Sequence, residues 1–247
     1  RTSAHACIAT AGLVVGLFAM PLSATPSLAT PQSSWNQGAK FTATRSMDTD
    51  HVADKALDVS TDNGDVKITK GGTDKVQVNA KVRATTQERL DATKVVTTRG
   101  ADGTLTVRVQ WPNNKRNNNE GCDLEVVVPS ATNVTAKTDN GSISAKELKG
   151  TVNLTTSNGS ISVDAWEGDA TVTTSNGSID LTGISGKVDA SSSNGRVRAK
   201  DVQGPVHAKT TNANVDVALK PASVGPVDIQ TDNGSVQLHV GSAFVGK

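Results

Sequence analysis

Charged side chains that recur at matching positions in the C-terminal half of the chain are the first candidates for chemistry. The set comprises Asp180, Arg196, Arg198, Lys200 and Asp216. Carboxylates beside basic residues on consecutive turns of a β-helix could cleave polysaccharides by acid–base chemistry. The simpler interpretation is a solvated face with alternating charges, and we favour it. Arg196, Arg198, Asp180 and Asp216 therefore remain as a candidate surface-binding face.

Histidine and cysteine offer little metal or nucleophile chemistry. His51, His207 and His239 are far apart, and none stands in a metal-binding spacing such as His-x-x-x-His. Cys122 could form an intermolecular bridge or carry a small adduct, but its place at the start of the strand-like run 122–128 favours a buried hydrophobe. Phosphate loops and Gly-x-Ser-x-Gly elbows are missing from the sequence. We therefore expect no catalytic residue, no metal site and no cofactor, and a protein that is not an enzyme.

A short repeat must position the charged residues. Asn-Gly pairs recur with a constant step between Asn140 and Gly195, and related pairs occur at Asn63 and Asn233. A fixed period this short indicates one small unit stacked on itself. The expected turn ladder consists of Asn63, Gly64, Asn140, Gly141, Asn158, Gly159, Asn176, Gly177, Asn194, Gly195, Asn233 and Gly234.

Apolar residues fall into five columns within each repeat. Ile161 and Val163 represent the first two, Trp166 the third, and Ala170 and Val172 the last two. Members of a pair are two residues apart with polar residues beside them, which is the period of a half-buried strand. The fold class is therefore all-β, a parallel β-solenoid with coils of about 18 residues and a less regular N-terminal β cap.

The turn residues have a conformational interpretation at this stage. We expect glycine to supply positive φ at the corners, and Asn to tolerate the left-handed region and to form a side-chain ladder. A series of type I′ hairpins is the ordinary meaning of Asn-Gly, but it would not explain the constant spacing. Two loops carry further expectations: the polar tract 113–121 as a mobile surface loop, and residues 239–247 as the cover of the last coil.

Three regions divide the chain. Residues 1–29 combine a weakly basic start, an apolar run and small residues, which predicts a signal peptide. Residues 30–130 form an N-terminal β region with the first coil and the cap. Residues 131–247 form the repeat solenoid, continuous with the preceding region.

The repeat and two further segments resemble a known family. The segments are Ala56–Gly64, with the sequence ALDVSTDNG, and Leu124–Pro129, with the sequence LEVVVP. They are similar to the bacterial putative-adhesin domain family, a domain of unknown function built of β-strand repeats in exported proteins. The resemblance covers about residues 40–240 and implies a β-solenoid in the cell envelope. It implies no catalytic residue.

The functional expectation is a non-catalytic protein, exported to the periplasm, the cell surface or the medium. It would act as an adhesin or scaffold that presents a polar Ser/Thr/Asn face to an unknown envelope protein or glycan. The formal net charge of +1 offers no field to gather nucleic acid, and no later segment predicts a membrane span. A polysaccharide-acting hydrolase or lyase is the alternative, and whether the array self-associates end to end stays open.

Overall fold

The computed structural model describes residues 40–245. The chain divides into two units, residues 1–35 and 36–247, and the described residues all belong to the second. The predicted signal peptide, residues 1–29, lies outside them, as do the last two residues.

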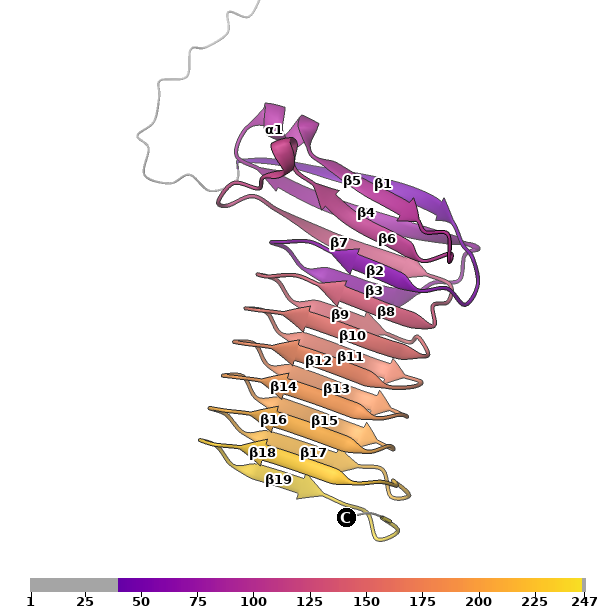
Figure 1. The fold of residues 1–247 in the computed structure, drawn as a ribbon, viewed down its shortest axis with the longest axis vertical. Helices are drawn as coiled ribbons and strands as arrows, with labels where there is room; N and C mark the ends of the chain where they lie inside the picture. Colours follow the sequence, from indigo (N-terminus) through magenta and orange to yellow (C-terminus); the bar gives the residue numbers. More distant parts are fainter. Residues whose placement is uncertain (1–39, 246–247) are drawn as a thin grey trace, which may run out of the picture. The chain divides into compact units, whose positions relative to one another are not determined.

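A stack of parallel coils forms most of the described chain (Figure 1). Each coil contributes one strand to sheet A and one to sheet B. The strands of the repeat are β8 (Asn133–Lys137), β9 (Ile143–Lys146), β10 (Thr151–Thr156), β11 (Ile161–Trp166), β12 (Ala170–Thr174), β13 (Ile179–Ile184), β14 (Val188–Ser192), β15 (Val197–Val202), β16 (Val206–Thr210), β17 (Val215–Leu219), β18 (Val227–Thr231) and β19 (Val236–His239).

The N-terminal elements are less regular. They are β1 (Phe41–Asp50), β2 (Leu57–Ser60), β3 (Val66–Lys70), β4 (Lys75–Ala84), α1 (Gln87–Ala92), β5 (Lys94–Arg99), β6 (Leu105–Gln110), the 3₁₀ turn η1 (Pro112–Asn114) and β7 (Gly121–Val128). Sheet A has the order β1-β4-β7-β3-β9-β11-β13-β15-β17-β19, and sheet B the order β18-β16-β14-β12-β10-β8-β2-β6-β5.

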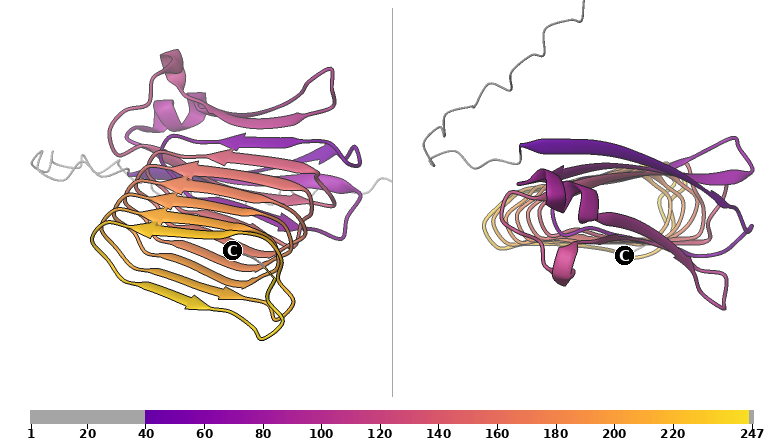
Figure 2. Two further views of the ribbon diagram at one scale, coloured as in Figure 1. Left: turned by 60° about the horizontal axis from the view of Figure 1, so that its bottom comes forward. Right: turned by 90° about the horizontal axis from the view of Figure 1, so that it is seen from above.

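The register of the coils confirms the predicted solenoid. Ile161 pairs with Ile143 and Ile179, and Val172 pairs with Leu154 and Ala190, each in parallel. Members of all five columns are buried between the two sheets, Trp166 included. Viewed along the stack, the coils lie nearly over one another (Figure 2). The apolar interior is therefore filled by equivalent side chains from successive coils.

The N-terminal cap is antiparallel at both sheet edges. β4 pairs antiparallel with β1 and with β7, and β5 pairs antiparallel with β6. Strands β1 and β5 were not expected from the sequence, because their polar alternation lacks the Asn-Gly signal. The strand-like run 122–128 expected from the sequence corresponds to β7.

The turn glycines are required for a different reason from the one predicted. Gly141, Gly159, Gly177 and Gly195 have no positive φ, and neither have the asparagines before them. A Cβ on Gly177 would instead lie 1.8 Å from the carbonyl oxygen of Gly159 in the preceding coil. The positive-φ explanation was therefore wrong for these residues, and the close approach of coil to coil is what excludes a side chain.

Positive φ occurs at two other positions of the repeat. The corner glycines Gly150 and Gly168 have φ values of 95° and 140°, as predicted for corners. The second position lies near the end of the sheet A strands. Glu147, Ala165, Gly183 and Asp201 have φ values of 59°, 53°, 69° and 54° and occupy the same place in successive coils. Each directly precedes a third-column residue, such as Trp166 after Ala165. The left-handed residue adds one position to the strand, so that the next side chain points inward again.

The C-terminal end differs from the expectation that residues 239–247 cover the last coil. Val245 forms a parallel bridge with Val224, and Phe244 is partly buried. Val236 and Leu238 in β19 nevertheless remain exposed. The described residues after β19 follow the preceding loop rather than crossing the open end, so the expected cover is not formed by them.

Candidate functional site

The predicted charged face lies on the outer side of sheet A. Asp180, Arg198 and Asp216 occupy one column on β13, β15 and β17, where Asp180 pairs with Arg198 and Arg198 with Asp216. Arg196 lies just before β15 and is exposed. The structure thus brings Asp180, Arg198 and Asp216 together and leaves Arg196 beside them.

Charge alternation dominates this column. Arg198 Nε lies 3.5 Å from Asp216 Oδ2. Similar pairs occur along sheet A between Lys67 and Glu125 at 2.7 Å and between Lys146 and Asp164 at 3.6 Å. Asp216 therefore has a cation within ion-pair distance, and Asp180 has Arg198 beside it in the strand register, which is the arrangement of a solvated face with alternating charges.

Three open hollows of similar size lie elsewhere on the surface. One, of about 420 Å³, is lined in part by Lys70 and Glu147, and a second, of about 400 Å³, lies against β5 and β6 beside Trp111. The third, of about 390 Å³, is lined in part by Asp65, Asp123 and Glu125. None of the three is lined by a residue of the candidate charged face, so that face does not supply the concave site around paired carboxylates that polysaccharide cleavage needs.

The turn asparagines form a continuous hydrogen-bonded ladder along one edge of the stack. Asn158 Nδ2 donates to Asn140 Oδ1 at 2.7 Å, and Asn176 donates to Asn158 at 2.8 Å. The series continues from Asn194 to Asn176, from Asn212 to Asn194 and from Asn233 to Asn212. Asn63 stands apart, because its Nδ2 donates to the carbonyl oxygen of Glu120. These amides are mostly used within the protein, so the ladder holds coils in register.

A buried polar column beside the ladder was missed by the sequence reasoning. Thr174 Oγ1 donates to the carbonyl oxygen of Gly159 at 3.0 Å and accepts from the N–H of Gly177 at 3.3 Å. The same inward position is occupied by Thr61, Thr138, Thr156, Thr174, Ser192 and Thr210. A Thr or Ser just beyond the fifth column, recurring once in each coil, was the available signal. The hydroxyls satisfy the carbonyl groups that the tight Asn-Gly turns bury.

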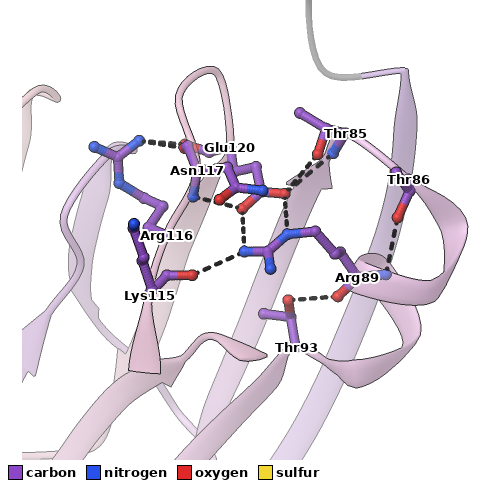
Figure 3. Close-up of polar contacts among 8 residues, drawn as sticks. All are labelled: Thr85, Thr86, Arg89, Thr93, Lys115, Arg116, Asn117 and Glu120. Atoms are coloured by element: carbon purple, nitrogen blue, oxygen red, sulfur yellow. Dashed lines mark hydrogen bonds and ion pairs between the residues drawn. The ribbon is translucent and has the colours of Figure 1, made fainter. Parts of the chain in front are cut away.

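The polar tract 113–121 is held by a buried ion pair rather than being simply a surface loop. The side chain of Glu120 is fully buried, and Arg89 of α1 donates to its Oε1 at 2.6 Å and its Oε2 at 2.7 Å (Figure 3). Thr85 Oγ1 and the N–H of Asn117 also donate to this carboxylate, both at 2.9 Å.

Electrostatics at Glu120 favour the charged form. Burial raises the pKa of its carboxyl, but the hydrogen bonds from Arg89, Asn117 and Thr85 outweigh burial and lower the pKa to about 2. Arg116, in the same tract, donates to the carbonyl oxygens of Asn117 and Glu120. The cluster fastens the loop to α1 and has the features of a structural clasp.

The remaining reactive residues have ordinary structural roles. Cys122 is buried, as the sequence favoured, and burial together with Asp123 raises the pKa of its thiol to about 12. His51 contacts Ser130 and His207 contacts Asp228, each at 3.1 Å. Within residues 40–245, no group of three or more His, Cys, Asp or Glu side chains could hold a metal ion, and no helix is long and apolar enough to span a membrane.

An uncharged polar surface covers the middle of sheet B. Its residues are exposed on β8, β10 and β12, and we call them the Thr/Asn patch: Asn133, Thr135, Thr151, Asn153, Thr155, Thr171 and Thr173. Neighbouring strands are about 4.8 Å apart and alternate residues about 6.6 Å apart, so the patch is a regular array of hydroxyl and amide groups. Thr151 donates to Asn133 at 2.8 Å within it.

Comparison with known proteins places the chain in a family. Residues 54–245 match the family described as Toastrack DUF4097. None of the curated proteins matches the chain. A structure described as a putative adhesin from Bacteroides fragilis is 15% identical, with 86% of this chain and 100% of that chain covered and a TM-score of 0.44. One described as a putative cell adhesion protein from Clostridium sporogenes is 12% identical, with 80% and 100% covered and a TM-score of 0.41.

A third structure carries a different description. It is called a putative lipid binding protein from Parabacteroides distasonis, and it is 12% identical, with 85% of this chain and 98% of that chain covered and a TM-score of 0.28. The assignment rests on the sequence match, which covers residues 54–245 and therefore all the coils and the cap except β1. The predicted resemblance to the putative-adhesin domains is thereby confirmed, and the chain belongs to the Toastrack DUF4097 family.

Proposed function

We propose that the protein is a non-catalytic scaffold that binds a polar envelope glycan or protein on the Thr/Asn patch. The observation that carries the proposal is the patch itself, a flat and exposed array of neutral hydrogen-bonding groups on three adjacent strands. Charged side chains flank it at Lys137 and Asp189. A neutral polar polymer could lie across the coils and meet the same groups at each step.

The energetics suit adhesion by many weak contacts. One neutral hydrogen bond contributes about 0.5–1.5 kcal/mol net, so a single short ligand would bind weakly. A polymer that spans several coils gains by multivalency, because each further contact forms at high effective concentration. This mode needs no deep cavity and no movement of the packed interior.

Export completes the proposed role. The segment 1–29 has the composition of a signal peptide, and we place the protein in the periplasm, at the cell surface or in the medium on that basis. The self-compensated column Asp180–Arg198–Asp216 supports a non-catalytic role, because each candidate acid already has a cationic neighbour.

Binding of the purified protein to immobilised envelope glycans and envelope proteins tests the proposal. The variant Thr155→Arg/Thr171→Arg places two bulky cations in the patch, and Thr182→Arg on the exposed face of sheet A is the matched control. We expect at least tenfold weaker binding for the patch variant and unchanged binding for the control. Equal binding by all three proteins, or cleavage of a polysaccharide by the wild type, would overturn the proposal.

A further inference from the structure

Exposed apolar side chains gather at the C-terminal end of the stack. We call the group the end patch; it consists of Val224, Val236, Leu238, Val240 and Val245, whose exposed fractions are 56, 46, 45, 50 and 70%. The other large hydrophobic residues with comparable exposure among residues 40–245 are Phe41 at 36% and Val52 at 39%. An apolar surface this localised is typical of an interaction site.

The end patch is a cross-section of the core. Val236 pairs with Val215 and Leu238 with Val217, which are buried members of the first and second columns. On sheet B, Val227 and Ile229 continue the fourth and fifth columns and are only partly buried. These side chains thus occupy interior positions of the repeat, and no further coil covers them among residues 40–245.

The strand edges at this end are also open. β18 and β19 are the last strands of their sheets, with a partner on one side in the described chain (Figure 1). β18 carries one charged residue, Asp228, and β19 carries neither Lys, Arg, Asp nor Glu. The edge strands at the other end are better protected, because β1 contains Arg45 and Asp48 and β5 begins with Lys94. Charged residues on an edge strand disfavour pairing with a strand of another molecule, so the C-terminal end of the stack is the better suited to such pairing.

We propose that the end patch binds the end patch of a second copy of this protein, related by a two-fold axis. The end patch of a second copy presents the same two edge strands, β18 and β19, with the same apolar side chains. The distance between the two strands is therefore the same in both copies. The two-fold axis makes the strands antiparallel across the contact, which allows regular hydrogen bonding between the open edges. Pairing centred on Ile229 sets Asp228 opposite Gln230 of the second copy, so the carboxylate meets an amide.

The size of the contact agrees with a reversible dimer. Strands of five and four residues are about 17 and 13 Å long, and the sheets are about 10 Å apart. Together with the loops 221–225 and 241–245, each end covers on the order of 600 Å², or about 1,200 Å² for the pair, at the lower limit for specific interfaces. We therefore expect dissociation in the micromolar range.

Analytical ultracentrifugation of the full chain tests the dimer. The wild type should change from monomer to dimer between about 1 and 100 μM and form nothing larger. Leu238→Lys should weaken the dimer at least tenfold, whereas Thr171→Lys on an exposed strand of sheet B should not. Both positions are exposed in the monomer, so neither variant should unfold it. A monomer at 100 μM, an unaffected Leu238→Lys variant or species that keep growing with concentration would each overturn the proposal.

Crosslinking tests the symmetry separately. A two-fold axis near β19 brings Leu238 close to Leu238 of the second copy, so Leu238→Cys in a Cys7→Ser background should form a disulfide dimer under mild oxidation. Thr171→Cys in the same background is the control and should not, and Cys122 is buried in both. Equal crosslinking of the two variants would contradict the two-fold arrangement. A different protein or a further chain segment as the natural occupant would leave the purified protein monomeric in the first experiment.

Discussion

Gly177→Ala probes the contact between successive coils most sharply. The new Cβ would lie 1.8 Å from Gly159 O, whereas real Cβ atoms keep about 3.0 Å from other atoms. The coils must therefore part locally by roughly 1 Å, because a packed interior has no free space to take up the added carbon. The same carbonyl accepts the buried hydrogen bond from Thr174, so the displacement breaks that bond as well.

The expected cost follows from these two effects. An unsatisfied buried polar group costs about 1–3 kcal/mol, and overpacking costs about 1–3 kcal/mol more. Near the middle of that range the loss is about 4 kcal/mol, and at about 2–4 °C per kcal/mol the melting temperature should fall by about 8–16 °C.

Thermal and urea unfolding followed by circular dichroism measure the effect. Gly72→Ala is the control, because a Cβ there would meet nothing within 4 Å, and its stability should change by less than about 0.5 kcal/mol. The urea m-value shows whether the array still unfolds as one unit, which stacked repeats do not always do. Equal melting temperatures for Gly177→Ala and Gly72→Ala would refute the close stacking of the turns.

Three further predictions concern other parts of the repeat and the cap. Thr174→Val should destabilise the protein by about 1–3 kcal/mol in urea unfolding, because the carbonyl of Gly159 loses its donor. Thr173→Val, at an exposed position, should have little effect. Equal urea midpoints for the two variants would show that the hydroxyl column is dispensable. Ala165→Gly should stabilise the protein by about 0.5–1 kcal/mol and Gly183→Ala should destabilise it by a similar amount, because both residues have positive φ. A Cβ on Gly183 makes only ordinary contacts at 3.5 Å, so crowding does not add to the effect. Stability changes of the opposite sign, measured by calorimetry, would contradict the left-handed assignment. The pKa of Glu120 is lowered to about 2 in the folded protein, whereas the ordinary pKa of this carboxyl is near 4.5. The ionised carboxylate therefore stabilises the fold above pH 4.5, and this stabilisation, on the order of 3 kcal/mol, is lost as the pH falls through 2. Free energies of unfolding measured from pH 5 to 2 should show this loss, and the Glu120→Gln variant should show a smaller pH dependence.

The repeat made much of the fold predictable. Ile161, Trp166 and Val172 mark columns whose constant spacing predicted that coils stack in register, and all three are buried. The cap was harder, because β1 and β5 are polar strands held by antiparallel partners distant in sequence. Their pairing is a tertiary property that no local period records.

Site residues were less accessible to sequence reasoning. Thr174 was not singled out from the sequence, although its parity within the strand pointed inward, because its role depends on a carbonyl group one coil away. Glu120 was hidden in a polar tract because its partner Arg89 lies far back in the sequence, on α1. Gly177 was recognised as a turn residue, but the requirement for glycine there comes from the close approach of the preceding coil and not from the φ of Gly177. Contacts between segments distant in sequence explain all three cases.

Distances between nitroxide spin labels test the central claim, direct stacking of equivalent residues, most directly. Thr135, Asn153, Thr171, Asp189, His207 and Asp228 form one outward column. Labels at 135 and 207 are four coils apart and should give about 19 Å by double electron–electron resonance, and labels at 135 and 228, five coils apart, about 24 Å. A constant increment of about 4.8 Å per coil is the result that stacking predicts. Distances that fail to increase with coil number, as hairpins folded into a sandwich would give, would contradict it.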